Sequence, residues 1–206
     1  FGNGQINHRK HRTSIHPFMK TVSGQVFTRE DFRFNPLESG EYEDCIFEHC
    51  NFYESKLRGI SLINCQFIDS DLSLVKIENT AFREVEFIRC KMTGVNFESA
   101  NDFGLRFSFK ETNLSYAIFY KKDLRKTLFE HCMLHETDFT QANLAESDFT
   151  DSDLSGAIFD QTHLEKANFT AAAHFRIIPE NNFLKKARFS QHQLSGLLLH
   201  TGIEIS

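Results

Sequence analysis

Residues 139–159 read FTQANLAESDFTDSDLSGAIF, in which a large apolar residue returns at every fifth position: Phe139, Leu144, Phe149, Leu154 and Phe159. Apolar residues recur at intervals of three and four on an amphipathic helix, and at intervals of two on a half-buried strand. A period of five fits neither pattern. The stretch therefore indicates a repeat architecture built from small identical units.

The period of five continues on both sides of this stretch. In the same phase, the large positions are also Phe109, Leu114, Phe119, Leu124, Phe129, Leu134, Leu164, Phe169 and Phe189. The first half keeps the period in a different phase, at Val22, Phe27, Phe32, Leu37, Tyr42, Phe47, Phe52, Leu57, Leu62, Phe67, Leu72, Ile77, Phe82, Phe87, Met92 and Phe97. The residue two places before each large one is small or modest, as Ala142, Ser147 and Ser152 are. Each unit thus supplies two inward side chains.

Units 142–146 (ANLAE) and 152–156 (SDLSG) resemble the A(D/N)LXX motif of the pentapeptide repeat proteins, and the resemblance covers roughly residues 22–170. It implies that four units make one square coil and that residues twenty apart lie above one another. The expected fold class is therefore all-β: a right-handed quadrilateral parallel β-helix, the pentapeptide repeat solenoid, with a short C-terminal helix. Neighbouring coils would share hydrogen bonds at a spacing of ~4.8 Å. Special structures would close the ends.

The chain divides into three parts. Residues 1–18 lie outside the repeat and are read as an N-terminal tail or an engineered remnant, with Met19 near the natural start. Residues 19–190 form the β-helix, with a break near 98–108 and an excursion near 171–184. The excursion contains Pro179, which has no N–H for a ladder hydrogen bond. Residues 191–206 form the C-terminal helix and a dimerisation tail.

Cysteine usage fits an intracellular protein. Each of the five cysteines stands two places before a large inward residue: Cys45, Cys50, Cys65, Cys90 and Cys132. The odd count and the absence of a paired CxxC spacing argue against a disulfide framework or a zinc site. We expect reduced, inert thiols that fill the core, in a cytoplasmic protein. Residues 1–18 lack the apolar run of a signal peptide, and no transmembrane stretch is present.

Negative charge is concentrated in one part of the sequence. Between Thr127 and Glu165 there is no Lys or Arg, but there are nine carboxylates: Glu130, Glu136, Asp138, Glu146, Asp148, Asp151, Asp153, Asp160 and Glu165. These side chains should project from the rod and give it a negative potential. Cations such as Lys121, Lys122, Arg125 and Lys126 would lie elsewhere or make their own contacts. The acidic stretch is either a solubilising surface or a mimic of nucleic acid.

The size of the charge limits the mimicry. About eight coils make a rod of roughly 38 Å, and duplex DNA of that length carries on the order of 22 phosphate charges. The formal net charge is −5, and it becomes −8 without residues 1–18, which carry three cations. Mimicry would therefore rest on the local acidic stretch, and we take its first eight carboxylates as partner-binding residues. Direct binding to DNA is disfavoured by the same charge.

The repeat breaks between Phe97 and Phe109, where twelve residues replace the expected ten. The break is either a packing defect, absorbed by the conformational freedom of Gly104, or a recognition loop on a rigid scaffold. The residues assigned to this loop are Asn101, Asp102, Phe103, Gly104 and Arg106.

Two segments narrow the resemblance. Residues 113–119 (NLSYAIF) and 194–205 (LSGLLLHTGIEI) resemble the quinolone-resistance branch of the family, the Qnr/McbG-like branch that includes a microcin-immunity relative. This resemblance implies a homodimer joined through the C-terminus, at Leu194, Leu197, Leu198, Leu199, Ile203 and Ile205. It also implies binding to DNA gyrase and topoisomerase IV as a surrogate for DNA, which protects them from quinolones or a toxin. The best-studied members carry two projecting loops, whereas here the first half keeps an unbroken register. A scaffold with an unrelated protein partner is the alternative.

Catalysis is not expected. In the closest histidine group, Cys132 would point inward while His131 and His135 would point outward, so the three groups cannot converge on one ion or substrate. There is no phosphate loop, metalloprotease motif or nucleophile elbow. Asp151 and Asp153 are more simply read as solvated surface than as a cation site. We expect no cofactor and no metal.

Overall fold

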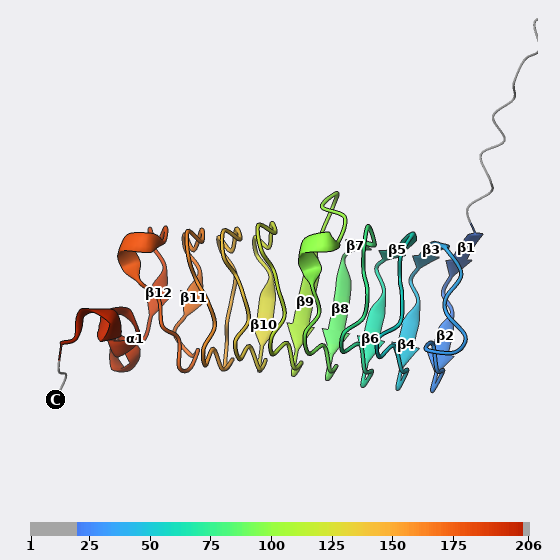
Figure 1. Cartoon of the computed structure of the whole chain (residues 1–206), viewed down its shortest axis with the longest axis horizontal. Helices are drawn as coiled ribbons and strands as arrows, with labels where there is room; N and C mark the ends of the chain where they lie inside the picture. The colour runs from blue at the N-terminus through green and yellow to red at the C-terminus, as the bar shows by residue number, and fades with distance from the viewer. Residues whose placement is uncertain (1–19, 204–206) are drawn as a thin grey trace, which may run out of the picture.

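The computed structural model describes residues 20–203. They form a rod in which the chain winds around one long axis, as a right-handed parallel β-helix of about eight turns (Figure 1). The predicted N-terminal tail, Met19 and Ile205 lie outside the described residues. The strands are β1 (Lys20–Ser23), β2 (Val26–Thr28), β3 (Gly40–Glu43), β4 (Ile46–Glu48), β5 (Ile60–Ile63), β6 (Gln66–Ile68), β7 (Ala81–Arg83), β8 (Val85–Ile88), β9 (Phe107–Lys110), β10 (Leu128–Glu130), β11 (Asn168–Phe169) and β12 (Arg188–Phe189). The helices are short: η1 (Phe97–Ser99), η2 (Pro179–Asn181), η3 (Gln191–Gln193), α1 (Ser195–Leu198) and η4 (Leu199–Thr201).

The rod has four faces, numbered here in the order in which each coil runs through them. Face 1 begins at Val22 and carries the sheet β1-β3-β5-β7, and face 2 begins at Phe27 and carries the sheet β10-β9-β8-β6-β4-β2. Face 3 begins at Phe32 and face 4 at Leu37; their coils are joined by isolated parallel bridges such as Asn51↔Asp71 and Lys56↔Lys76. Partners are twenty residues apart within each half, as the repeat predicts.

At the corner of many units, an Asp or Asn side chain fixes the backbone by a hydrogen bond. The Asp or Asn before the large residue accepts a hydrogen bond from the N–H two residues further on, as Asn143 does from Ala145 at 3.2 Å and Asp148 from Thr150 at 2.9 Å. Such local bonds favour turns over helix or strand. Many corners then place a residue in the left-handed region, such as Asp151 at φ 52°. The D/N position of the motif thus caps the turn in the units that carry Asp or Asn there.

The small inward residues satisfy backbone carbonyls inside the rod. The Thr162 hydroxyl donates to the Phe139 carbonyl at 2.9 Å, and the Ser147 hydroxyl donates to the Leu124 carbonyl at 2.8 Å. Each of these bonds joins one coil to the preceding coil. A buried carbonyl left without a donor would cost free energy. These positions therefore favour small side chains that carry a donor.

The cysteines occupy the same small inward positions, as predicted. All five are free and buried. The Cys132 thiol lies 3.5 Å from the Phe109 carbonyl, which is the contact that a serine or threonine hydroxyl makes elsewhere. Burial raises the pKa of Cys90 and of Cys132 to about 12 and that of Cys65 to about 11. These three thiols are therefore held in the neutral, unreactive form.

Aromatic ladders fill the core. On face 2, one Phe from every coil stacks on the next, with centroids 4.8 Å apart between Phe27 and Phe47 and 5.2 Å apart between Phe169 and Phe189 at the other end. Rings on face 4 stack in the same way, for example Phe119 and Phe139 at 5.4 Å. Stacked pairs add about 0.5–1.5 kcal/mol each to the free energy of burial. Adjacent coils are therefore fastened to each other through their interior.

The predicted break is present and lies on face 1. The strand pair β8–β9 places Phe87 opposite Phe109, an offset of 22 residues, which confirms the phase shift of two. The chain leaves the coil after Ala100 and returns at Arg106, so that this coil is two residues longer than the others. The Arg106 N–H donates to the Phe82 carbonyl at 3.1 Å. Between these points a turn projects from the rod, visible in green beside β7 in Figure 1.

The C-terminal end is closed by helix and by one displaced aromatic. Phe175 packs between Phe169 and Phe189, with ring centroids 5.8 and 5.3 Å away. The Ile177 N–H donates to the Gly196 carbonyl at 3.0 Å, which fastens α1 to the last coil. Ala173 and Phe183 still pair with the residues twenty before them. Between those two bridges the chain carries η2.

Candidate partner-binding surface

The nine carboxylates of the acidic stretch surround the rod. A stretch of this length makes about two coils, so its side chains are distributed over all four faces rather than along one. Glu146 and Glu165 lie on face 1; Glu130, Asp148 and Asp151 on face 2; Glu136 and Asp153 on face 3; Asp138 and Asp160 on face 4. We call these nine residues the acidic collar. The expected negative potential is therefore confined to one part of the rod.

Bases from neighbouring coils face several collar carboxylates. The Glu146 carboxylate lies 2.8 Å from the Lys166 ammonium and 3.9 Å from that of Lys126. Lys110 lies 3.2 Å from Glu130 across the same kind of coil-to-coil contact. The hydrogen bond with Lys166 accordingly lowers the pKa of the Glu146 carboxyl group below its usual value. Part of the collar's charge is thus neutralised by residues outside the acidic stretch.

Asp153 is the collar carboxylate that lies between two histidines. It accepts the Ser155 N–H at 3.0 Å, and His174 and His135 lie 2.9 and 3.1 Å from its two oxygens. Burial of this carboxyl acts to raise its pKa, but the contacts from Ser155 and the two histidines outweigh burial and hold the pKa well below the usual range. Asp153 therefore carries its charge throughout the physiological range, between two ionisable bases.

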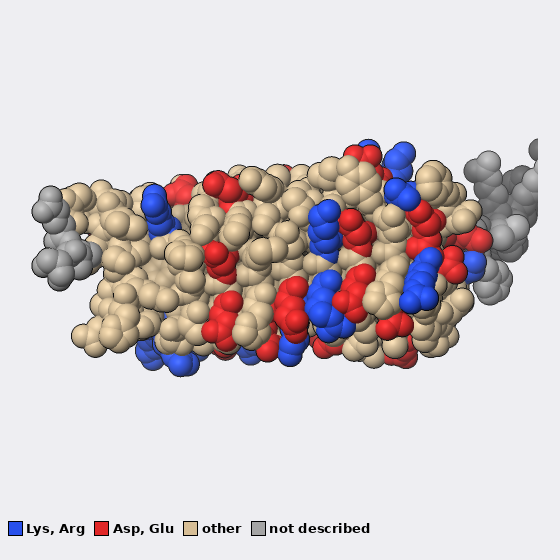
Figure 2. All heavy atoms as spheres, turned by 90° about the horizontal axis from the view of Figure 1, so that it is seen from below, with Lys and Arg blue, Asp and Glu red and all other residues tan. Residues whose placement is uncertain are grey.

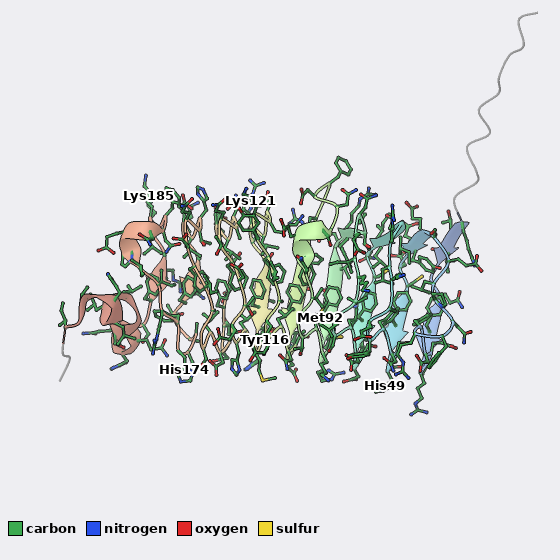
Figure 3. The ribbon with its side chains drawn as sticks, viewed as in Figure 1. His49, Met92, Tyr116, Lys121, His174 and Lys185 are labelled. Atoms are coloured by element: carbon green, nitrogen blue, oxygen red, sulfur yellow. The ribbon has the colours of Figure 1, made fainter. Side chains whose placement is uncertain are left out.

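Charge is unevenly distributed along the rod. Figure 2 views the rod from below, the side on which Tyr116 and His174 lie in Figure 3. Acidic and basic side chains are intermixed over its N-terminal half, and the C-terminal half of this view shows fewer charges. Face 3 also exposes apolar side chains: Leu74 is 44% exposed and Tyr116 61%. Lys121 and Lys185 lie along the opposite edge of the rod (Figure 3).

The turn at residues 101–106 is the second candidate contact. The Asn101 side chain accepts the Phe103 N–H at 2.8 Å, and Gly104 follows in the left-handed region at φ 70°. Phe103 is 75% exposed, and the Arg83 guanidinium lies 5.3 Å from the centre of its ring. Exposed aromatics of this kind are frequent anchors in protein interfaces. The turn thus presents an apolar side chain on an otherwise polar edge.

Lys122 makes contacts of its own, which is one of the two arrangements expected for the cations beside the acidic stretch. Its neighbours in the sequence group it with the surface cations Lys121, Arg125 and Lys126, but its side chain is buried, with 4% exposed. Its ammonium donates to the Ala100 carbonyl at 2.9 Å and to the Asp102 carboxylate at 2.6 Å. The signal was present in the sequence, because Lys122 stands at a small inward position.

The C-terminal segment exposes a row of apolar side chains. Leu194, Leu198, Leu199 and Ile203 are exposed by 39 to 59%. Leu197 differs from them, because it is half-buried and packs against the core of its own rod. Of the residues assigned to a dimer interface, four are therefore available to a second molecule.

Two further properties concern residues 20–203 alone. Within this range, no three side chains of His, Cys, Asp or Glu are grouped so that they would hold a metal ion. No helix of the same range has the length and apolarity that crossing a bilayer requires.

Comparisons with known proteins assign the repeat. A family model described as a pentapeptide repeat region matches residues 41–119, and one described as pentapeptide repeats (8 copies) matches residues 108–145 and 147–172. Together the matches span well over half of the chain. Among curated protein sequences, none is similar enough to count as a match.

The comparison with solved structures supports the fold through QnrB1. A trypsin-treated variant of QnrB1, described as a plasmid-mediated fluoroquinolone resistance protein, is 20% identical, with a TM-score of 0.59 and an alignment that covers 91% of this chain and 92% of that trypsin-treated chain. HetL, described as a pentapeptide repeat protein involved in heterocyst differentiation regulation in the cyanobacterium Nostoc sp. strain PCC 7120, is 16% identical, with a TM-score of 0.36 and coverage of 82% and 86%.

Proposed function

Since this chain belongs to the pentapeptide repeat family, we propose that it acts by binding a protein and that the partner is a type II topoisomerase, DNA gyrase or topoisomerase IV. In this proposal the rod occupies the place of a DNA segment on the enzyme. The protein itself performs no catalysis, works in the cytoplasm and protects the topoisomerase from quinolones or from a toxin.

The observation that carries the proposal is the likeness in fold to QnrB1, which spans 91% of this chain and 92% of the trypsin-treated QnrB1 chain. The resemblance of residues 113–119 and 194–205 to the quinolone-resistance branch supports the same assignment.

The acidic collar supplies the DNA-like feature. It places carboxylates around about two coils, and the rod's overall charge is too small to imitate a long duplex. We therefore assign the collar to one short contact with a positively charged groove, where complementary charge speeds association and fixes orientation. The remainder of the rod contributes shape.

The same proposal makes the protein a homodimer. The exposed apolar side chains of Leu194, Leu198, Leu199 and Ile203 would meet those of a second rod at the C-terminal end. An isologous contact of this kind joins two rods end to end and doubles the length of the surrogate duplex.

The first experiment titrates the purified protein into a gyrase supercoiling assay, with and without a fluoroquinolone, and scores supercoiled and cleaved DNA. Rescue from the drug supports a protector. Inhibition without rescue supports DNA mimicry alone, and no effect in either arm contradicts the topoisomerase proposal.

The collar has a matched control within the chain. Asp151 and Asp153 stand at the same two positions of their units as Asp69 and Asp71 do, outside the collar. Replacing each pair by Asn removes two charges, and at Asp153 and Asp71 it keeps the oxygen that accepts the turn N–H. We expect the double change D151N/D153N to weaken the effect on gyrase at least fivefold and D69N/D71N to leave it within twofold. Equal effects would contradict a role for the collar.

A scaffold role with an unrelated protein partner is the second candidate. The pairing of Glu146 with Lys126 and Lys166 favours it, because paired carboxylates stabilise the surface without presenting free charge. The parent protein, the collar variant D151N/D153N and the control D69N/D71N would then all leave gyrase unaffected.

A further inference from the structure

Lys122 breaks the pattern of the inward positions. From Thr112 to Ala167, each of the other residues at the equivalent position is small, as Ala117, Thr127 and Ala142 are. Lys122 lies on face 1 in the coil directly after the break, so the exception and the irregularity adjoin each other. A long charged side chain at such a position must find partners inside the rod.

The Lys122 ammonium replaces a backbone N–H as the hydrogen-bond donor between two coils. In regular coils, the carbonyl of the small inward residue accepts an N–H from the next coil, as Thr127 does from Asp148 at 3.0 Å and Lys122 from Asn143 at 2.8 Å. Ala100 is the residue at this position where the chain leaves the coil. Its carbonyl accepts the Lys122 ammonium at 2.9 Å instead. The side chain thus closes the ladder where the backbone diverges.

The same ammonium holds the projecting turn. It donates to the Asp102 carboxylate at 2.6 Å, one residue before the exposed Phe103. Charge-assisted bonds of this length are stronger than neutral ones. The Asn101 amide donates to Asn79 at 3.1 Å, and Arg106 pairs with Glu84 at 3.0 Å, which ties both ends of the turn to the preceding coil. The base of the turn is fixed at three points while its tip projects.

We propose that Lys122 is a positioning residue, which holds the 101–106 turn in one conformation so that Phe103 inserts as a preformed anchor into an apolar pocket of the protein partner. The proposal rests on the proposed function in taking a topoisomerase as that partner. A turn that is already ordered loses less conformational freedom on binding than a mobile one, and the partner gains affinity accordingly.

The chain contains no Trp, so Phe103→Trp places one fluorescent reporter at the tip of the turn. In this background, Lys122→Met keeps the volume of the aliphatic stem and removes both hydrogen bonds. We expect lower fluorescence anisotropy and at least a twofold larger acrylamide quenching constant. Lys122→Thr, the residue type found at Thr127, serves if the Met variant does not fold. Lys121→Asn, at the exposed neighbouring position, should change neither quantity. Unchanged anisotropy in the Lys122 variants would overturn the positioning role.

The binding arm uses the gyrase titration with Phe103 restored. Phe103→Ala and Lys122→Met should each weaken the effect about tenfold, and the double variant should be no weaker than Phe103→Ala alone. Full potency of Lys122→Met together with a loosened turn would refute the preformed anchor. An inactive parent protein would instead refute the topoisomerase proposal, and the anisotropy arm would still decide whether Lys122 holds the turn.

Discussion

The ring of Phe149 lies parallel to that of Phe169 one coil further on, with centroids 4.6 Å apart and planes 10° apart. Phe149 is also stacked on Phe129 at 5.0 Å, so its ring is enclosed from both sides along the rod axis. Each ring of the ladder thus depends on its two neighbours. This arrangement makes the stability of the solenoid a sum of contacts between adjacent coils.

Replacing Phe149 by Ala should lower the free energy of unfolding by about 3–5 kcal/mol, because it removes a buried ring and leaves a cavity between two others. Phe189 ends the same ladder and is half-buried, so Phe189→Ala should cost clearly less. Urea denaturation followed by circular dichroism measures both values. Equal losses would show that the interior of the ladder is no better packed than its end.

Removing the Asp148 side chain should destabilise the protein because two hydrogen bonds of the turn are lost, and not because a charge is lost. Its carboxylate accepts the Thr150 N–H at 2.9 Å and the Thr150 hydroxyl at 2.6 Å. Asp148→Ala should cost about 1 kcal/mol, the net worth of such bonds. Asp148→Asn keeps an accepting oxygen and should stay within about 0.5 kcal/mol of the parent. Thermal unfolding of the two variants tests this, and a larger loss in the Asn variant would assign the effect to charge.

The buried thiols should be inert in the folded protein. Burial raises the pKa of Cys90 and Cys132 to about 12, so at pH 8 only about one in ten thousand of these thiols would be a thiolate. In a titration with a thiol-specific disulfide reagent, we expect slow reaction in buffer and rapid reaction of all five thiols in guanidinium chloride. Rapid labelling of the native protein would contradict their burial.

The contribution of Asp153 should depend on acid pH. Its pKa is lower in the folded chain than in the unfolded one, so the folded state binds fewer protons. The stabilisation is therefore complete above the unfolded pKa of about 4 and shrinks as the pH falls below it. Because a third of the side chain is exposed, we expect no more than about 1 kcal/mol. The difference in unfolding free energy between the parent and Asp153→Asn should be constant from pH 7 to 5 and decrease toward pH 3. If the difference instead increased toward pH 3, Asp153 would have a higher pKa in the folded state than in the unfolded state, and the prediction would be wrong.

The proposed dimer makes two neighbouring leucines behave differently. Leu198 is 39% exposed and belongs to the proposed interface, so Leu198→Arg should give a folded monomer by light scattering. Leu197 packs against its own core, and Leu197→Arg should lower the melting temperature. A parent-like mass for the Leu198 variant would place any dimer contact elsewhere.

Much of this protein was readable from the sequence, because every unit repeats the same local environment. An inward Phe or Leu, a small residue two places before it and a capping Asp or Asn between them recur together, so one unit such as 142–146 explains the others. The cysteines followed the same rule and lie where it places them. The break is visible in the sequence as a change in the phase of the five-residue period, and the pairing of Phe87 with Phe109 confirms it.

Only the tertiary structure decided which charges meet. Glu146 has no Lys within its own stretch, yet Lys126 and Lys166 reach it from the coils on either side. Likewise, nothing near Lys122 in the sequence shows that its ammonium donates to the Ala100 carbonyl and the Asp102 carboxylate. The physical reason is that burial in a solenoid is set within one unit, whereas electrostatic partners are set by the stacking of coils about twenty residues apart. The repeat thus determined the rod, and the register between its coils determined the surface that a partner would meet.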